Sequence, residues 1–186
     1  MHTTAIPDAH LVVASVADPN AFGEVFDRHA RTVFRFASRR VGSELAKDVT
    51  AETFSIAFER RARFDPERGA VLPWLLGIAT NVMRNHARAE RRRLRATASA
   101  DVVHDDVDDR LDAAAAAPAL ARALSALKSG DREAVLLFAW TSLGYDGIAQ
   151  ALDIPMGTVA SRLSRARRVL REELRRAGWT MDPEEE

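Results

Sequence analysis

The chain has 186 residues, enough for one domain or two small ones; 47% of them are apolar and 6% are aromatic. This composition fits an alanine- and leucine-rich helical protein and excludes a chain too polar to fold. The absence of cysteine excludes disulfides and thiolate chemistry, and without an apolar run of about 18 residues we expect no membrane span.

The start of the chain is unlike a secretory signal. The first 20 residues contain acidic residues but neither lysine nor arginine, whereas a signal begins with a basic stretch followed by an apolar block. We therefore expect a cytoplasmic protein.

The net charge is zero, but basic and acidic residues are strongly segregated along the chain. Residues 84–95 contain six arginines, residues 101–112 contain six aspartates, and residues 157–176 contain seven arginines. Two basic segments on either side of an acidic one predict contacts with a polyanion at two places. Salt bridging across solvated faces is the alternative.

The first half has apolar residues at helical spacing. We expect helices over 20–40, over 44–61 with Ser43 as the N-cap, and over 73–93 with a proline in the first turn. The segment 64–69 is rich in turn-forming residues and predicts a loop.

The composition changes after the third helix. Residues 97–112 carry many aspartates and few large apolar side chains, and they predict a flexible, solvated linker. Helical patterns resume and are separated by glycine and proline; they cover residues 119–127, 132–143, 146–152 and 158–176.

These patterns predict an all-α protein with two small helical domains joined by a flexible acidic linker. The first domain would be residues 1–96 and the second residues 118–178, with the linker at 97–117 and an acidic tail at 179–186. Each domain is close to the lower size limit for an independent core, so docking on a larger partner would stabilise both.

The second half contains the parts of a helix-turn-helix. A short helix over 146–152 is followed by a turn and by a longer helix that Thr158 is expected to cap. Opposite its apolar stripe this helix carries serines and arginines, which fit phosphates and base edges in a major groove. The candidate DNA-binding residues are Thr158, Ser161, Arg162, Ser164, Arg165 and Arg168. A solvated helix that merely closes the domain is the alternative.

A second polar row lies on the helix over 73–93. Asn81, Arg84, Asn85 and Arg88 lie on the side opposite its apolar residues. Amides and guanidinium groups in a row suit unstacked single-stranded bases, and Trp74 could add an aromatic surface. A core position for Trp74 is equally open, and solvation of the polar row is a further alternative.

The helix over 44–61 carries a third candidate surface. Asp48 and Glu52 align on one side, and Phe54 and Phe58 lie beside them. An acidic and apolar face of this kind can bind another protein, although such a face is usually just solvated.

Together these segments resemble the extracytoplasmic-function (ECF) sigma factors of bacterial RNA polymerase. The resemblance covers roughly residues 20–95 and 120–176. It is carried by three stretches in a fixed order around the acidic linker, namely 47–54, 73–93 and 144–167.

The resemblance implies that the first domain binds the clamp of core RNA polymerase and opens the minus-ten element. It implies that the second domain reads the minus-thirty-five element and touches the polymerase flap. Asp48, Glu52 and Phe54 would then bind polymerase, and the two polar rows would bind promoter DNA. The loop over 64–72 would hold a flipped base, and an anti-sigma factor would be a further partner.

Four positions depart from the family pattern. Ala51 stands where glutamine is common, and Ala160 where a basic residue is common; Ser164 replaces a bulkier residue, and Gly147 stands in place of the usual glutamate. We expect these changes to retune one clamp contact and the preferred promoter sequence, and to leave the fold intact.

Two other functions compete with this interpretation. An operator-binding regulator with the same helix-turn-helix would bind duplex DNA alone, without polymerase. A metal protein could use His104 and the aspartates of 105–109. No nucleophile–base pair or phosphate loop is evident, so we expect no enzyme activity, no cofactor and no metal.

Overall fold

The computed structural model describes residues 6–97 and 118–177, in which there are only helices and the segments that join them. The all-α prediction is confirmed for this part of the chain. The predicted linker and tail, together with His104, lie outside it. No described helix is both long and apolar enough to cross a membrane.

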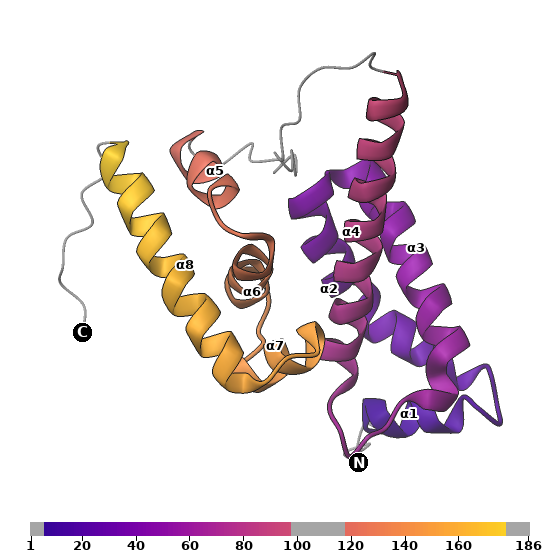
Figure 1. Cartoon of the computed structure of the whole chain (residues 1–186). Coiled ribbons are helices and arrows are strands. Elements are labelled where there is room, and N and C mark those ends of the chain that lie inside the picture. Colours follow the sequence, from indigo (N-terminus) through magenta and orange to yellow (C-terminus); the bar gives the residue numbers. More distant parts are fainter. Residues whose placement is uncertain (1–5, 98–117, 178–186) are drawn as a thin grey trace.

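The helices form two groups that lie side by side, with α7 next to α4 (Figure 1). The first group comprises α1 (Asp8–Ala14), α2 (Ala21–Val41), α3 (Ser43–Arg60), the short 3-10 helix η1 (Arg61–Arg63) and α4 (Val71–Thr97). The second group comprises α5 (Pro118–Ser125), α6 (Ser129–Trp140), α7 (Tyr145–Leu152) and α8 (Met156–Arg176).

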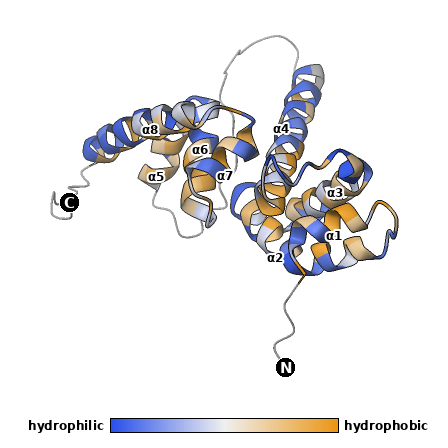
Figure 2. Ribbon diagram, turned by 90° about the horizontal axis from the view of Figure 1, so that it is seen from below, coloured by the Kyte–Doolittle hydropathy of each residue, from blue (hydrophilic) through white to orange (hydrophobic). Residues whose placement is uncertain are grey.

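The core of the first group lies among α2, α3 and α4. Val33 and Phe36 from α2, Val49 from α3, and Leu75 and Leu76 from α4 are almost completely buried there. Val33 and Leu75 belong to the apolar stripes predicted from the helical spacing, whereas Phe26 of the same predicted stripe on α2 is 45% exposed. Figure 2 shows the hydrophobic sides of the helices turned toward one another.

The buried apolar residues of the second group belong to the same hydrophobic cluster as those of the first, and a buried arginine ties α6 to the end of α5. Leu137, Ile148 and Leu163 are buried where α6, α7 and α8 meet. Arg132 of α6 donates hydrogen bonds to the carbonyls of Leu124, Ser125 and Leu127, at distances of 2.8–3.1 Å. Because the last carbonyls of a helix lack partners within it, Arg132 stabilises the end of α5.

The short helix α1 was not expected from the sequence. It buries Leu11 and Val12 against the first core. Asp8 fixes its start, because Arg28 Nη1 donates to Oδ1 at 2.7 Å and Nε2 of His29 lies 2.6 Å from Oδ2. Contacts distant in sequence therefore stabilise a helix too short to form alone.

Two predicted N-caps are wrong. Ser43 is the first residue of α3, whose cap is Gly42 with φ = 80°, a left-handed backbone that glycine adopts without strain. Helix α8 begins at Met156 after Pro155, so Thr158 lies inside its first turn.

The two groups meet at a close helix contact. A Cβ atom added to Gly77 of α4 would lie 2.5 Å from the carbonyl oxygen of Ala151 in α7. Beside it, the N–H of Ala70 donates to Oε1 of Gln150 at 3.0 Å, and Nε2 of Gln150 donates to the Ala70 carbonyl at 2.8 Å. Glycine at residue 77 thus permits the approach of α7 to α4.

Candidate nucleic-acid interface

Helix α4 presents most of the predicted polar row to solvent. Asn81, Asn85 and Arg88 are exposed, while Ile78 and Val82 on the opposite side are buried. The amphipathic phase predicted for this helix is therefore confirmed.

Arg84 belongs to the same row but is engaged by the second group of helices. Its Nε and Nη2 lie 3.1 Å and 2.5 Å from the two carboxylate oxygens of Glu133 in α6. Its Nη1 donates to Oδ1 of Asn81 at 3.0 Å. A contact of Arg84 with DNA would therefore compete with Glu133.

Trp74 is partly buried and packs against the loop that precedes α4. Its ring centroid lies 5.0 Å from that of Phe64. Within this loop the N–H of Glu67 donates to Oδ1 of Asp65, which closes a turn. Trp74 thus supports the loop from inside, and a direct contact with DNA stays a prediction.

Helices α7 and α8 are the two helices of the helix-turn-helix, and a tight turn joins them. Asp153 ends α7 in the left-handed conformation with φ = 51°, which aspartate tolerates better than most residues. Ile148, Val159 and Leu163 are buried at the junction of the two helices. This packing fixes which side of α8 faces solvent.

The exposed side of α8 carries most of the predicted residues. Ser161, Ser164, Arg165 and Arg168 are exposed, whereas Thr158 and Arg162 are half-buried. The Ser161 hydroxyl donates to the Thr158 carbonyl at 3.0 Å. A serine bonded in this way keeps its oxygen as an acceptor.

Two acidic residues of α6, which were not predicted as site residues from the sequence, form ion pairs with arginines of the two polar rows. Asp131 pairs with Arg165 through hydrogen bonds of 3.2 Å and 2.9 Å, and this contact raises the pKa of Arg165. Glu133 pairs with Arg84. Both residues lie in the first two turns of α6, and no local pattern distinguishes them from solvated carboxylates.

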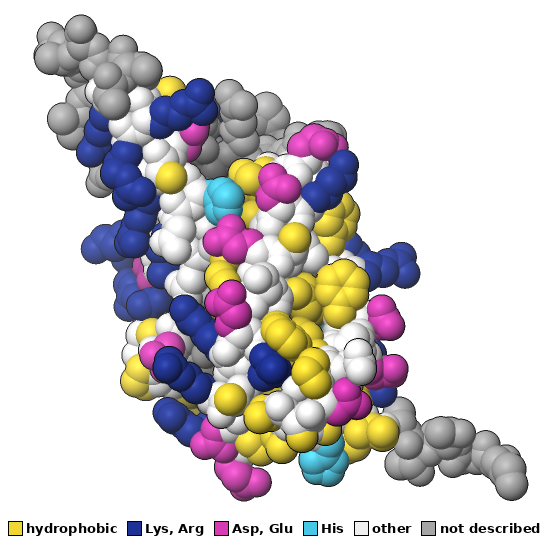
Figure 3. Space-filling view, turned by 90° about the vertical axis from the view of Figure 1, so that its right-hand side faces the viewer, with side chains coloured by type: hydrophobic (Ala, Val, Ile, Leu, Met, Phe, Trp, Pro, Cys, Tyr) yellow, Lys and Arg dark blue, Asp and Glu magenta, His cyan; other side chains and the backbone are white. Residues whose placement is uncertain are grey.

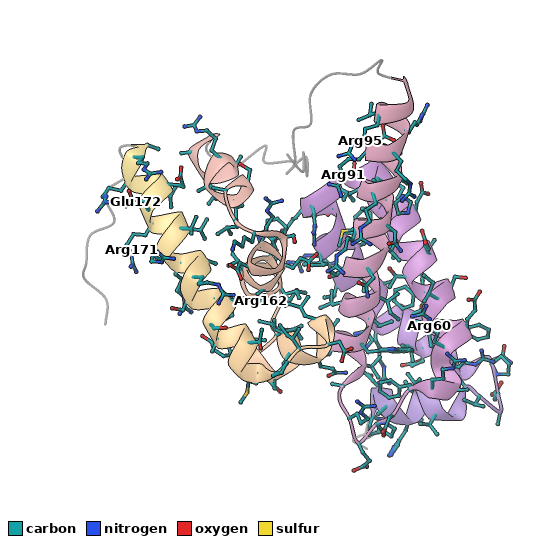
Figure 4. All side chains as sticks on the ribbon, viewed as in Figure 1. Arg60, Arg91, Arg95, Arg162, Arg171 and Glu172 are labelled. Carbon is teal, nitrogen blue, oxygen red and sulfur yellow. The ribbon has the colours of Figure 1, made fainter. Side chains whose placement is uncertain are left out.

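A basic cleft of about 710 Å³ lies between the two groups. Arg91 of α4 and Arg162 of α8 are on opposite sides of it (Figure 4). Glu133 is the one carboxylate among its described lining residues. The cations in the lining are Arg40, Arg84, Arg88, Arg91, Lys128, Arg132 and Arg162.

The candidate polymerase-binding surface is mixed acidic and aromatic. Asp48 and Glu52 are exposed on α3. Phe54 is only 5% exposed and lies under Phe26 of α2, whose ring centroid is 4.8 Å away and which is 45% exposed. Phe26, missed by the sequence analysis, therefore supplies the exposed ring. Figure 3 shows hydrophobic and acidic side chains gathered on one face of the molecule.

No group of three or more His, Asp or Glu side chains within residues 6–97 and 118–177 could hold a metal ion. The residues proposed from sequence as metal ligands lie in the undescribed segment.

Known proteins share this arrangement. The family model for sigma-70 region 2 matches residues 25–93, and that for sigma-70 region 4 matches residues 118–170. The ECF RNA polymerase sigma factor SigC of Mycobacterium tuberculosis is 30% identical over 91% of this chain and 94% of its own length. BldN of Streptomyces coelicolor, another ECF sigma factor, is 29% identical over 84% of this chain, which spans 61% of that relative.

A solved structure agrees with these sequence matches. CnrH in complex with the cytosolic domain of CnrY has a TM-score of 0.63 and 26% identity, and the match covers 90% of this chain and 97% of CnrH. The chain belongs to the extracytoplasmic-function sigma factors of RNA polymerase.

Proposed function

We propose that this chain binds core RNA polymerase and directs it to promoters, where it opens the minus-ten element and reads the minus-thirty-five element. One observation carries the proposal. Two helices in separate domains each expose a polar row while their apolar side is buried: asparagine and arginine on α4, serine and arginine on α8. One such row suits one stretch of nucleic acid, and two suit a bipartite promoter.

The α4 row would contact the minus-ten strand after the duplex opens. Asn81 and Asn85 have amides that read the edges of unstacked bases, and Arg84 and Arg88 have guanidinium groups that hold phosphates. The loop supported by Trp74 lies at the start of the same helix and would receive a flipped base.

The exposed side of α8 would enter the major groove at the minus-thirty-five element. Arg165 and Arg168 can each bond two acceptors on guanine, and the Ser161 and Ser164 hydroxyls reach phosphates or base edges. Thr158 and Arg162 are less exposed and would contact DNA at the margin of this surface.

The acidic and aromatic surface of α2 and α3 would contact the polymerase clamp. Asp48 and Glu52 offer charge, and Phe26 with Phe54 beneath it offers an apolar anchor. The second domain would meet the polymerase flap. CnrH was solved with a second protein bound, and we propose that an anti-sigma factor likewise holds this chain in the cytoplasm. We propose no catalysis by the chain itself.

Reconstitution with core RNA polymerase tests the proposal. Run-off transcription on a library of genomic fragments is expected to yield transcripts that share two sequence elements, and core polymerase alone should yield none. An operator-binding regulator would give the opposite result. It would bind one duplex site tightly without polymerase and add no transcript, and that outcome would overturn the proposal.

A further inference from the structure

We infer that Met156 reads a thymine in the minus-thirty-five element, through contact of its side chain with the C5 methyl group of that base. The inference rests on the proposed function, because it assigns base specificity to the helix that would enter the major groove. Met156 is not among the residues predicted from the sequence to bind DNA, because its side chain is neither charged nor a strong hydrogen-bonding group.

The first support is the place of Met156 in the helix-turn-helix. It is the first residue of α8, the second helix of the motif, and directly follows Pro155. In this motif the N-terminal residues of the second helix contact base edges, while the first helix crosses the DNA backbone. The exposed Ser161 and Ser164 follow in the same half of α8. Met156 therefore lies at the end of α8 that would approach the bases.

The second support is the exposure of an apolar side chain at this point. Met156 is 59% exposed, more than any other large apolar residue that the structure describes. It does not belong to the hydrophobic cluster of the described residues. Phe138, the other exposed large apolar residue of the described second group, packs against the ring of Tyr145 at a centroid distance of 6.1 Å. Contact with another molecule would remove the apolar surface of Met156 from water.

The third support is the open space beside Met156. Gly157 follows it, and a Cβ atom added to this glycine would have no neighbour within 4 Å. Ala160, one turn further along on the same side of the helix as Met156, is exposed and carries only a methyl group. No bulky side chain at these two positions keeps a base pair away, so the longer side chain of Met156 is able to reach a base edge.

The chemistry of the side chain selects the base. Methionine has no hydrogen-bond donor and only a weakly accepting sulfur, so the polar edges of guanine, adenine and cytosine offer it little. Thymine alone carries a methyl group in the major groove, and proteins recognise that group by apolar contact. The flexible, unbranched side chain of methionine adapts its shape to such a contact. Met156 therefore favours a T·A pair at one position of the element.

Replacement of thymine by deoxyuridine tests the contact, because the two bases differ only by the methyl group. The probe is a duplex promoter selected by run-off transcription, in which each thymine of the minus-thirty-five element, on either strand, is replaced one at a time. Electrophoretic mobility shift with the reconstituted holoenzyme measures the affinity. At one position the parent holoenzyme is expected to lose about fourfold in affinity, the factor that corresponds to one buried methyl group.

Variants of Met156 link that position to this residue. Met156→Ala should bind the thymine and deoxyuridine promoters equally well. Met156→Leu keeps an apolar side chain of similar size and should retain the preference for thymine, whereas Met156→Gln has a polar end and should lose it. All three residues are good helix formers, and the exposed position leaves the core intact. The control is Val13→Ala, which shortens an exposed apolar side chain of α1 and should retain the parent's preference.

Two results would overturn the inference and leave the proposed function standing. In the first, the parent holoenzyme binds every deoxyuridine promoter as tightly as the unsubstituted one. In the second, Met156→Ala shows the same loss on deoxyuridine as the parent, so that another residue reads the methyl group. A parent holoenzyme that binds and transcribes no promoter at all would instead overturn the proposed function, and the inference with it.

Discussion

Arg165 and Asp131 form a two-pronged ion pair between α8 and α6. The Asp131 side chain is 10% exposed, whereas the Arg165 side chain is 49% exposed. The carboxylate therefore holds the guanidinium group from one side while the rest of it faces solvent. An arginine fixed in this way loses less side-chain entropy when it binds a base than a mobile one does.

Replacing Arg165 is expected to weaken promoter recognition. Arg165→Ala should lower the affinity of the polymerase holoenzyme for its promoter at least about fivefold, because a base contact is lost. Asp131→Asn should have a smaller effect in the same direction, because the arginine remains but is less well oriented. Electrophoretic mobility shift with the holoenzyme measures both affinities.

The control for this prediction is Arg175→Ala. Arg175 is also an exposed arginine of α8 in an ion pair, but it lies in the last turn of the helix, far from the helix-turn-helix. Equal losses for Arg175→Ala and Arg165→Ala would mean that α8 provides only diffuse positive charge.

The α4 row predicts a defect in the opening of promoter DNA, after the polymerase holoenzyme has bound it. Asn85→Ala and Arg88→Ala should leave the closed promoter complex almost unchanged and reduce the fraction of opened DNA about tenfold. The first variant loses a hydrogen bond to an unstacked base and the second loses one to a phosphate of the opened strand, each worth on the order of 1 kcal/mol or more. Permanganate footprinting of unpaired thymines measures opening. A normal level of opening in both variants would show that α4 does not contact the minus-ten element.

The sequence predicted those features that depend on local periodicity. The buried positions Leu75, Ile78 and Val82, and the exposed positions Asn81 and Asn85, follow from the 3.6-residue repeat of α4. The same reasoning placed Val159 and Leu163 on the buried side of α8. Each of these predictions needs only the identity of neighbouring residues.

The features that were missed depend on contacts distant in sequence. Helix α1 is stabilised by the contact of Asp8 with residues of α2. The pairing of Glu133 with Arg84 joins residues 49 positions apart. Neither carboxylate differs in local sequence from a solvated one, so only the packing of the helices shows what each binds.

The polymerase-binding surface predicts a charge-reversal effect. Asp48→Lys should weaken binding to core polymerase about tenfold, because a like charge would then face the cationic partner that the acidic face implies. Phe26→Ala should also weaken binding, through loss of the exposed ring above Phe54. Competition with a labelled sigma factor for core polymerase measures both, and Asp18→Lys in the loop before α2 is the control. If Asp48→Lys competes for core polymerase as well as the parent chain does, this face does not bind polymerase and is simply solvated.

The anchoring of α1 predicts a dependence of stability on pH. Partial burial raises the pKa of Asp8, but the hydrogen bonds from Arg28 and His29 outweigh this effect, and the pKa lies below its ordinary value of 3.8. A carboxyl group whose pKa is lowered by folding stabilises the folded state above its unfolded pKa. That contribution is lost as the pH falls through the folded value.

Asp8→Asn is therefore expected to lower the free energy of unfolding at pH 7, and the difference from the parent chain should shrink as the pH falls below about 4. Urea denaturation followed by circular dichroism at several pH values measures this difference. Asp27→Asn, an exposed aspartate of α2, controls for the loss of one negative charge. A difference between Asp8→Asn and the parent that stays constant down to pH 2 would show that the carboxylate charge does not anchor α1.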